Sequence, residues 1–87
     1  MEVLTTFCKE HGDARAPIEA WVAEVQHAQW KGPNDVKAVY PSASILANSI
    51  FIFNIKGNRY RLETQIAFGT GVVLLKRAGT HAEYDRW

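Results

Sequence analysis

The stretch "SIFIFNIKGNRYRLETQIAF", residues 49–68, decides the fold. Its first part, 49–55, is rich in β-branched and aromatic residues, which is typical of a strand in a sheet. The segment "KGN" at 56–58 predicts a turn, because Gly and Asn both accept a positive φ. Residues 59–68 then alternate between the two faces of a second strand. One face carries Tyr60, Leu62, Thr64, Ile66 and Phe68, and the other carries Arg59, Arg61, Glu63, Gln65 and Ala67.

The residues that follow this hairpin add a third strand. "GTG" at 69–71 predicts a second tight turn. "VVLLKR" at 72–77 predicts a strand whose apolar run, 72–75, is buried. The segment from about 49 to 77 is therefore expected to form an antiparallel meander. Its apolar face should pack on helices, which leaves the other face open, polar and basic.

The residues before the meander predict helices. A short helix at 3–10 is expected to end at Gly12 with a left-handed cap, and Asp13 is expected to cap the next helix. In that second helix, apolar residues recur at helical spacing and form one stripe. The stripe consists of Ile18, Trp21, Val22, Val25 and Ala28.

A third, short helix completes the predicted fold. It is expected to start at Asn34 or Asp35 and to stop before Pro41. The chain then reads as one α+β domain, 1–87, with N-terminal helices packed on a small antiparallel sheet. The expected parts are helices at about 3–40, the meander at about 49–77 and a C-terminal motif at 78–87.

The composition excludes several classes of protein. The chain of 87 residues is 47% hydrophobic, which indicates one folded domain. Its single cysteine, Cys8, excludes an internal disulfide and a multi-cysteine zinc site, and is expected to be a small buried hydrophobe. His11 and His27 lie in helical segments and are interpreted as isolated surface residues. Because the sequence lacks a signal peptide and any apolar run long enough to span a bilayer, we expect a cytoplasmic protein without membrane contact.

Positive charge gathers in the second part of the chain. Residues 1–55 carry four basic and six acidic side chains, whereas residues 56–87 carry six basic and three acidic ones. This bias favours an anionic partner such as phosphate or nucleic acid; the alternative is ordinary solvated charge. In a meander the end of the third strand lies beside the start of the second, so cations from distant segments should converge. These cations are Lys56, Arg59, Arg61, Lys76 and Arg77.

The C-terminal motif "THAEYD", residues 80–85, should emerge at the same edge. His81 has the side-chain type whose unperturbed pKa lies near neutrality, so it is a candidate acid or base. The alternative is that His81 begins a helix behind a capping box of Thr80 and Glu83. Tyr84 is a candidate for base stacking or a proton relay, and the alternative is that its ring packs on the sheet edge.

Such a cluster suits RNA cleavage without a metal ion. The 2′-OH is deprotonated and attacks the adjacent phosphate, a general acid protonates the leaving 5′-oxygen, and cations stabilise the charge on phosphorus. Arg61 suits the phosphate because its fork donates two parallel hydrogen bonds; the alternative is a surface cation paired across the sheet. Two other functions stay open: a module that binds RNA or a protein without cutting, and a purely structural partner in a complex.

Two motifs at a defined spacing carry a family resemblance. The run "FNIKGNRYRL" (53–62), followed further along by "THAEYD" (80–85), resembles the HigB family of bacterial toxin–antitoxin systems. The segment "WKGPNDVKAVYPSA" (30–43) is similar to the middle part of the same family. The resemblance covers nearly the whole chain.

The resemblance implies a fold, an activity and partners. The implied fold is RelE-like, with N-terminal helices on a small antiparallel sheet. The implied activity is that of an mRNA interferase, an endoribonuclease that cuts messenger RNA at the ribosome with no metal or other cofactor, and the implied partner is a HigA-type antitoxin. By position, the resemblance implies catalytic roles for Arg61, Lys76, His81 and Tyr84. We predict supporting, RNA-binding roles for Lys56, Arg59 and Arg77.

Overall fold

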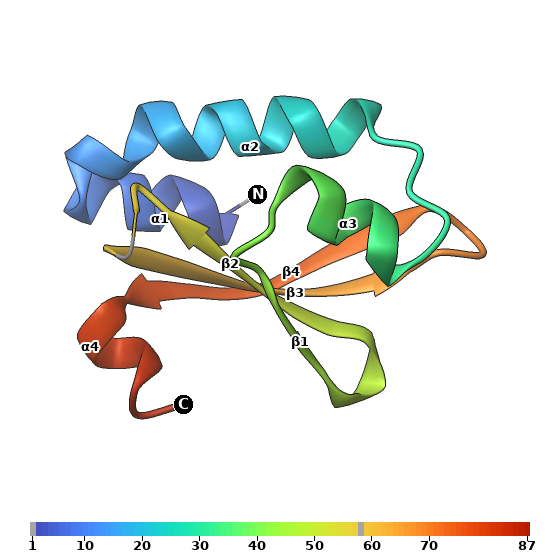
Figure 1. Cartoon of the computed structure of the whole chain (residues 1–87). Coiled ribbons are helices and arrows are strands. Elements are labelled where there is room, and N and C mark those ends of the chain that lie inside the picture. Colours follow the sequence, from blue (N-terminus) through green and yellow to red (C-terminus); the bar gives the residue numbers. More distant parts are fainter. Residues whose placement is uncertain (1, 58) are drawn as a thin grey trace.

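The computed structural model describes the backbone of residues 2–57 and 59–87 and the side chains of 4–57 and 59–87. Three helices lie on one face of an antiparallel sheet and a short fourth helix lies on the other (Figure 1). The helices are α1 (Glu2–Glu10), α2 (Arg15–His27), α3 (Pro33–Val39) and α4 (His81–Tyr84). The strands are β1 (Ser44–Leu46), β2 (Ile50–Ile55), β3 (Tyr60–Ala67) and β4 (Val72–Thr80). This is the α+β fold class that the sequence predicts.

The sheet has the strand order β1-β2-β3-β4, and each neighbouring pair is antiparallel. The predicted hairpin is confirmed, because β2 and β3 pair along their length, with Phe53 opposite Leu62. In the turn between them Lys56 and Gly57 have φ values of 53° and 67°. Asn58, the third residue of the predicted turn, lies outside the described residues.

Strand β1 is an addition to the predicted three-stranded meander. It pairs with the start of β2, with Ile45 opposite Phe51, and all of its residues are exposed. The connection to β2 passes through Asn48 and Ser49, whose φ values are 63° and 61°. An exposed edge strand of three residues is too short for an alternating pattern to be recognised in the sequence.

The core lies between the sheet and helices α1, α2 and α3. The predicted alternation on β3 is confirmed, since Tyr60, Leu62, Thr64 and Ile66 are all buried. Trp21 of α2 meets Phe53 of β2 edge to face, with ring centroids 5.4 Å apart. Helices α1, α2 and α3 and strand β2 supply further buried side chains: Phe7, Cys8, Ile18, Val36 and Phe51. Each large side chain buried in this way contributes about 1.5–3 kcal/mol to folding.

Strand β4 differs from its predicted form in length and burial. It runs to Thr80, three residues past the predicted end at 77. Its apolar run is not buried throughout: Val72 and Leu74 are each 55% exposed, while Val73 and Leu75 pack against the core. Helices α1, α2 and α3 cover one face of the sheet and α4 covers only part of the other, so alternate residues of an apolar run on this edge strand point away from the core.

A register shift interrupts the pairing of β4 with β3. Thr64 lies opposite Leu75, whereas the preceding Glu63 lies opposite Arg77. Lys76 is therefore the extra residue of a β-bulge, which gives the edge strand a local bend. Bulges of this kind re-aim side chains near a sheet edge.

Two predicted helix caps are wrong. Gly12 opens a short 3₁₀ helix (Gly12–Ala14) instead of ending α1 with a positive φ. Asp13 caps no helix, because the N-cap residue of α2 is Ala14 and it makes no side-chain cap bond. The carboxylate of Asp13 is used elsewhere, in contacts with the β2–β3 turn.

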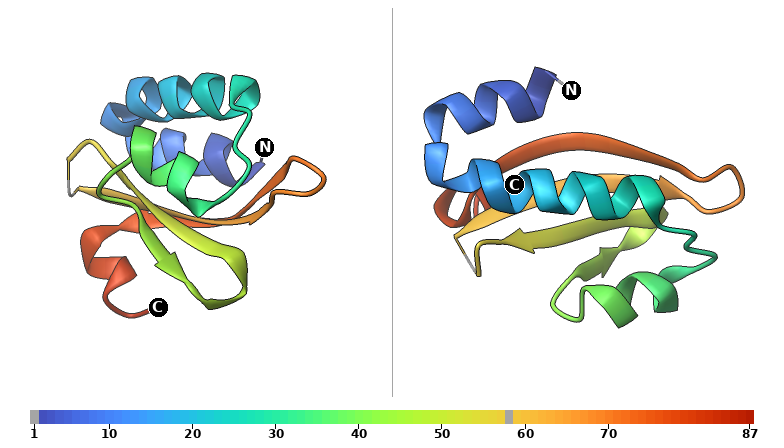
Figure 2. Two further views of the ribbon diagram at one scale, coloured as in Figure 1. Left: turned by 45° about the vertical axis from the view of Figure 1, so that its right-hand side comes forward. Right: turned by 90° about the horizontal axis from the view of Figure 1, so that it is seen from above.

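The second face of the sheet is less open than predicted. Helix α4 folds against this face where β3 begins and β4 ends, as two directions of view show (Figures 1 and 2). Ile52 lies on this face opposite Glu63 and is only 2% exposed, so the face is polar and basic only in part. Among the described residues, no helix is both long enough and apolar enough to cross a membrane.

Candidate active site

Arg61, His81 and Tyr84 come together where β3 starts and α4 begins. The Nη2 of Arg61 lies 3.0 Å from Nδ1 of His81. The guanidinium carbon of Arg61 lies 5.3 Å from the centre of the Tyr84 ring, within the range of a cation–π contact. The sheet register produces this meeting, because Arg61 pairs with Gly79, two residues before His81. Arg61 is only 7% exposed, so its cation is held in a nearly buried position.

A capping box fixes the start of α4. The hydroxyl of Thr80 accepts a hydrogen bond from the Glu83 N–H at 3.2 Å, and the Glu83 carboxylate accepts one from the Thr80 N–H at 3.0 Å. The His81 N–H donates to the Arg59 carbonyl at 3.0 Å, which ties α4 to the start of β3. The backbone and side-chain bonds with Thr80 lower the pKa of Glu83. The expectation that His81 begins a helix behind a capping box is therefore confirmed, and the His81 ring also contacts Arg61.

The contact with Arg61 defines the tautomer of His81. A guanidinium only donates hydrogen bonds, so Nδ1 of His81 accepts and the ring proton of the neutral form resides on Nε2. Nε2 lies 3.8 Å from the Asp85 carboxylate, which is too long for a hydrogen bond. One nitrogen of the imidazole thus contacts the Arg61 cation, and the other lies on the side of the Asp85 carboxylate.

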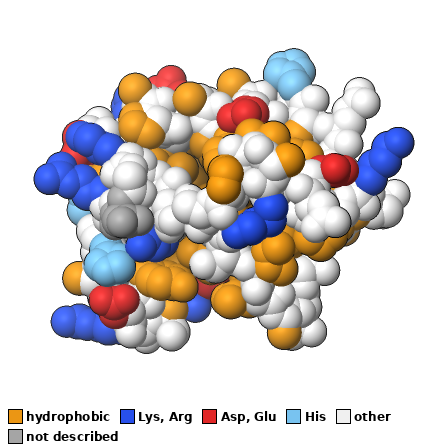
Figure 3. Space-filling model, in the orientation of Figure 1, with side chains coloured by type: hydrophobic (Ala, Val, Ile, Leu, Met, Phe, Trp, Pro, Cys, Tyr) orange, Lys and Arg blue, Asp and Glu red, His pale blue; other side chains and the backbone are white. Residues whose placement is uncertain are grey.

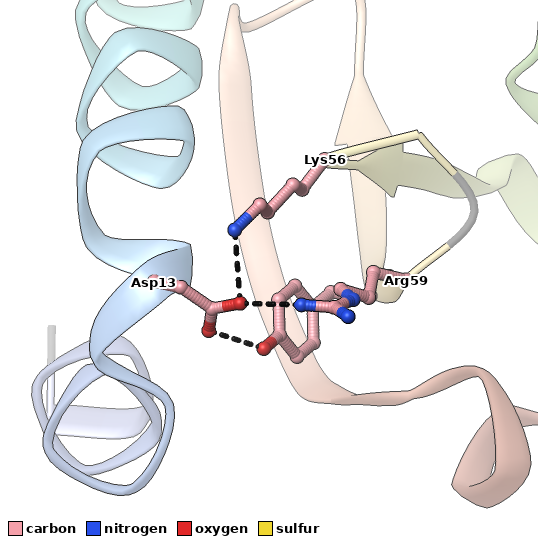
Figure 4. A network of polar contacts seen from close by, with 4 residues as sticks. Asp13, Lys56 and Arg59 are labelled. Atoms are coloured by element: carbon pink, nitrogen blue, oxygen red, sulfur yellow. Dashed lines mark hydrogen bonds and ion pairs between the residues drawn. The ribbon is translucent and has the colours of Figure 1, made fainter.

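The carboxylate of Asp13 contacts the basic side chains of the β2–β3 turn (Figure 4). Its Oδ2 lies 3.0 Å from Nζ of Lys56 and 2.9 Å from Nη1 of Arg59, and its Oδ1 accepts a hydrogen bond from the Tyr60 hydroxyl. These contacts, that with Tyr60 first and then that with Lys56, hold the pKa of Asp13 well below its usual range. The sequence gives no sign of this role, because the partners lie more than 40 residues further along the chain.

A shallow pocket opens beside these groups. Its lining residues come from the α1–α2 connection, the β2–β3 turn and the start of α4: His11, Lys56, Arg59, Tyr60, Thr80, His81 and Ala82. Figure 3 shows Lys, Arg and His side chains gathered at this end of the molecule. The interpretation of His11 as an isolated surface residue is wrong, since its ring centroid lies 5.3 Å from that of Tyr60 and 4.6 Å from that of Phe7.

Lys76 and Arg77 do not converge with Arg59 and Arg61 as predicted. Because β4 continues to residue 80, the positions opposite the start of β3 are occupied by Gly79 and Thr80. Arg77 lies two residues before Gly79, on the same face as Arg61, where its Nε donates to Glu63. Lys76 is exposed in the bulge and is absent from the lining of the pocket.

Trp87 packs beside the site, against Arg77, Tyr84 and Gly79. The guanidinium carbon of Arg77 lies 4.3 Å from the centre of the Trp87 ring, and that ring meets Tyr84 edge to face at 5.4 Å. The indole covers Gly79 so closely that an added Cβ would lie 2.8 Å from Cζ2 of Trp87. The absence of a side chain at Gly79 therefore allows the aromatic pair to lie against β4.

The site holds cations, imidazoles and phenols. Within residues 4–57 and 59–87, no group of three or more His, Cys, Asp and Glu side chains is arranged to hold a metal ion.

A family model described as the HigB toxin, the RelE-like toxic component of a toxin–antitoxin system, matches residues 14–87. A search of curated proteins found no match.

Proposed function

The chain belongs to the HigB toxin family of RelE-like toxins, and from this premise we propose that it is a metal-independent endoribonuclease that cuts messenger RNA on the ribosome. Membership of the family also implies an antitoxin partner, and we propose one of the HigA type. The toxin would act in the cytoplasm, where messenger RNA and ribosomes are found. Cutting messages there stops translation and growth.

The contact between the nearly buried Arg61 and His81 supports this proposal most strongly. A cation removed from water is costly unless it has partners, so its placement beside an imidazole is typical of a functional site. A phosphate group bound beside His81 would meet the imidazole and the Arg61 guanidinium together, since Arg61 contacts that ring although it does not itself line the pocket. Arginine is suited to this ligand because it donates paired hydrogen bonds to two phosphate oxygens.

The proposed reaction uses each of these groups in a defined way. Arg61 binds the scissile phosphate and stabilises the charge that develops on it. His81 transfers a proton, and Tyr84 stacks on an adjacent base or orients the substrate. When Arg61 turns to the phosphate, Nδ1 of His81 loses its donor and becomes free to accept the proton of the 2′-OH.

The remaining basic residues bind the RNA on either side. Lys56 and Arg59 line the pocket and are held there by Asp13, so they suit the neighbouring phosphates. Lys76, exposed in the bulge, and Arg77, on the sheet face beside Trp87, suit phosphates further from the cut. Lys76 therefore has a smaller proposed role than the one that the family resemblance implies.

Expression of the toxin without its antitoxin tests the proposal. Wild type should arrest growth and fragment bulk messenger RNA, whereas Arg61→Ala and His81→Ala should do neither. His27→Ala is the matched control, because His27 is an exposed histidine on α2 outside the site. Normal growth and intact messages with the wild type would refute the nuclease and favour a binding module that does not cut.

A further inference from the structure

We propose that His11 is a second catalytic residue, which donates the proton to the leaving 5′-oxygen while His81 takes the proton from the 2′-OH. This inference rests on the proposed RNA cleavage and deepens it. In the reaction the 2′-O–H and P–O5′ bonds break, and the 2′-O–P and 5′-O–H bonds form. The products are a 2′,3′-cyclic phosphate and a 5′-hydroxyl, with no net change in protons.

The site needs a second proton-transfer group, and the groups predicted from the sequence do not supply a suitable one. Arg61 remains charged at any relevant pH and cannot serve as an acid. The Tyr60 hydroxyl donates its one proton to the Asp13 carboxylate, and Lys56 is ion-paired with the same carboxylate. Tyr84 and Lys76 are absent from the pocket lining. An imidazole is the side chain best matched to proton transfer near neutral pH, and His11 lines the same pocket as His81.

His11 has a fixed position in that pocket. Its N–H donates to the Phe7 carbonyl at 2.9 Å, and its carbonyl accepts from the Ala14 N–H at 2.9 Å. Its ring packs against the rings of Phe7 and Tyr60, at 4.6 and 5.3 Å between centroids, and those two rings lie 5.4 Å apart, so the three form one cluster. A proton donor that is held by backbone bonds and ring contacts is oriented before the substrate arrives.

The two imidazoles have different neighbours. Nδ1 of His81 accepts a hydrogen bond from the Arg61 guanidinium, so it can accept a proton once that donor turns to the phosphate, and its Nε2 lies 3.8 Å from the Asp85 carboxylate. The ring of His11 packs against those of Phe7 and Tyr60, and its charge adds to the bonds with Thr80 in lowering the pKa of Glu83. His81, beside the arginine that binds the phosphate, is therefore assigned as the base, and His11, from a separate segment of the pocket lining, as the acid.

Other charged and titratable groups line the same pocket as His11. Lys56 and Arg59 of the β2–β3 turn are paired with Asp13, which lies two residues after His11 in the chain, and Tyr60 and His81 are also part of the lining. Both His11 and Asp13 precede residue 14, where the match to the family model begins.

A substrate with a sulfur leaving group tests the assignment. In a 5′-bridging phosphorothiolate RNA, the leaving thiolate needs no acid, because a thiol has a pKa of about 8.5. The cut bond is first mapped for the wild type on ribosome-bound messenger RNA, and sulfur is then placed at that bond. His11→Gln should cut ordinary RNA at least about a hundredfold more slowly than wild type. It should cut the phosphorothiolate at close to the wild-type rate.

Two further variants complete the design. His81→Gln should be slow on both substrates, since a good leaving group does not replace a base, and His27→Gln should match the wild type on both. Recovery of His11→Gln on the phosphorothiolate also shows that the variant is folded. The inference is overturned if His11→Gln cuts ordinary RNA normally, or is equally slow on both substrates. A wild type that cuts neither substrate refutes the proposed nuclease itself.

Discussion

At the scale of single residues, Arg61 has the most constrained environment in the site. It is nearly buried, it donates to His81, and it lies against the ring of Tyr84. Each contact uses a different property of the guanidinium: its charge, its fork of donors and its flat face. A lysine at the same position would keep the charge and lose the other two.

Arg61→Lys therefore separates charge from geometry. We expect the variant to remain folded, because a cation still lies over Tyr84, and to cut RNA roughly a hundredfold more slowly, since one preorganised donor to the phosphate is missing. Single-turnover cleavage of ribosome-bound messenger RNA measures the effect, with the thermal unfolding midpoint as the control for folding. Equal rates for the two proteins would show that charge alone is needed at this position.

The lowered pKa of Asp13 predicts how the stability of the fold depends on pH. Contacts with Tyr60, Lys56 and Arg59 lower its pKa in the folded state, so the carboxylate stabilises the fold above its unfolded pKa of about 3.9 and loses that contribution as the pH falls further. Asp13→Asn should therefore lower the free energy of unfolding more at pH 7 than at pH 3. Urea unfolding of both proteins at the two pH values measures this. The same loss at both would show that the Asp13 charge does not stabilise the fold.

From the sequence, a contact between two side chains could be predicted only where the alternation along the strands and the pairing of those strands bring the two residues together. The meeting of Arg61 with His81 followed from the meander and is found in the structure. The contacts of His11 and Asp13 were missed, because their partners follow from how the α1–α2 connection packs on the β2–β3 turn. Neither segment carries a motif that points to the other.

At the scale of elements, the C-terminal end of β4 and α4 act as one unit. The capping box starts α4 directly after the strand, and the helix then returns the chain so that Trp87 covers Gly79 and Arg77. The sequence predicted the capping box from Thr80 and Glu83 but not the length of the strand before it. The bulge at Lys76 hid that length, because an extra residue breaks the alternation by which a strand is recognised.

Gly79→Ala tests whether this unit is tightly packed. The new Cβ would lie 2.8 Å from Trp87 and 3.3 Å from the Cβ of Glu83, so the indole must move and the capping box is strained. We expect a loss of about 1 kcal/mol, or roughly 4–8 °C in Tm. RNA cleavage should weaken as well, since α4 positions His81.

Gly69→Ala is the matched control for this prediction. It makes the same chemical change in the β3–β4 turn, where an added Cβ has no neighbour within 4 Å and the φ is not positive. Its Tm should stay within a degree or two of the wild-type value. Similar Tm values for both alanine variants and the wild type would mean that Trp87 does not pack on Gly79 in solution.

At the scale of the whole molecule, the two ends of the sheet have different surfaces. The end with the β2–β3 turn and α4 carries the pocket with its cations and imidazoles (Figure 3). Along the free part of the second face, Leu46, Val72 and Leu74 are exposed apolar residues. The charge asymmetry of the sequence correctly indicated that basic residues cluster. The sequence also predicted that the second face of the sheet is open, polar and basic, because it gave no sign of where α4 would fold.

This difference between the ends predicts where RNA binds. Because single-stranded RNA releases counterions when cations contact its phosphates, the logarithm of affinity falls with that of salt by about 0.7 per phosphate contact. Replacing Lys56 and Arg59 together by Gln should make that slope shallower by up to about 1.4. Lys31→Gln is the control, because Lys31 lies in the α2–α3 connection at the end of the molecule opposite the β2–β3 turn (Figure 1). The measurement uses 2′-deoxy-substituted RNA, which cannot be cut, over a series of salt concentrations. If Lys31→Gln reduces the slope by about half as much as the double variant, which removes twice the charge, RNA follows the net charge of the protein, and the cluster held by Asp13 is not its binding site.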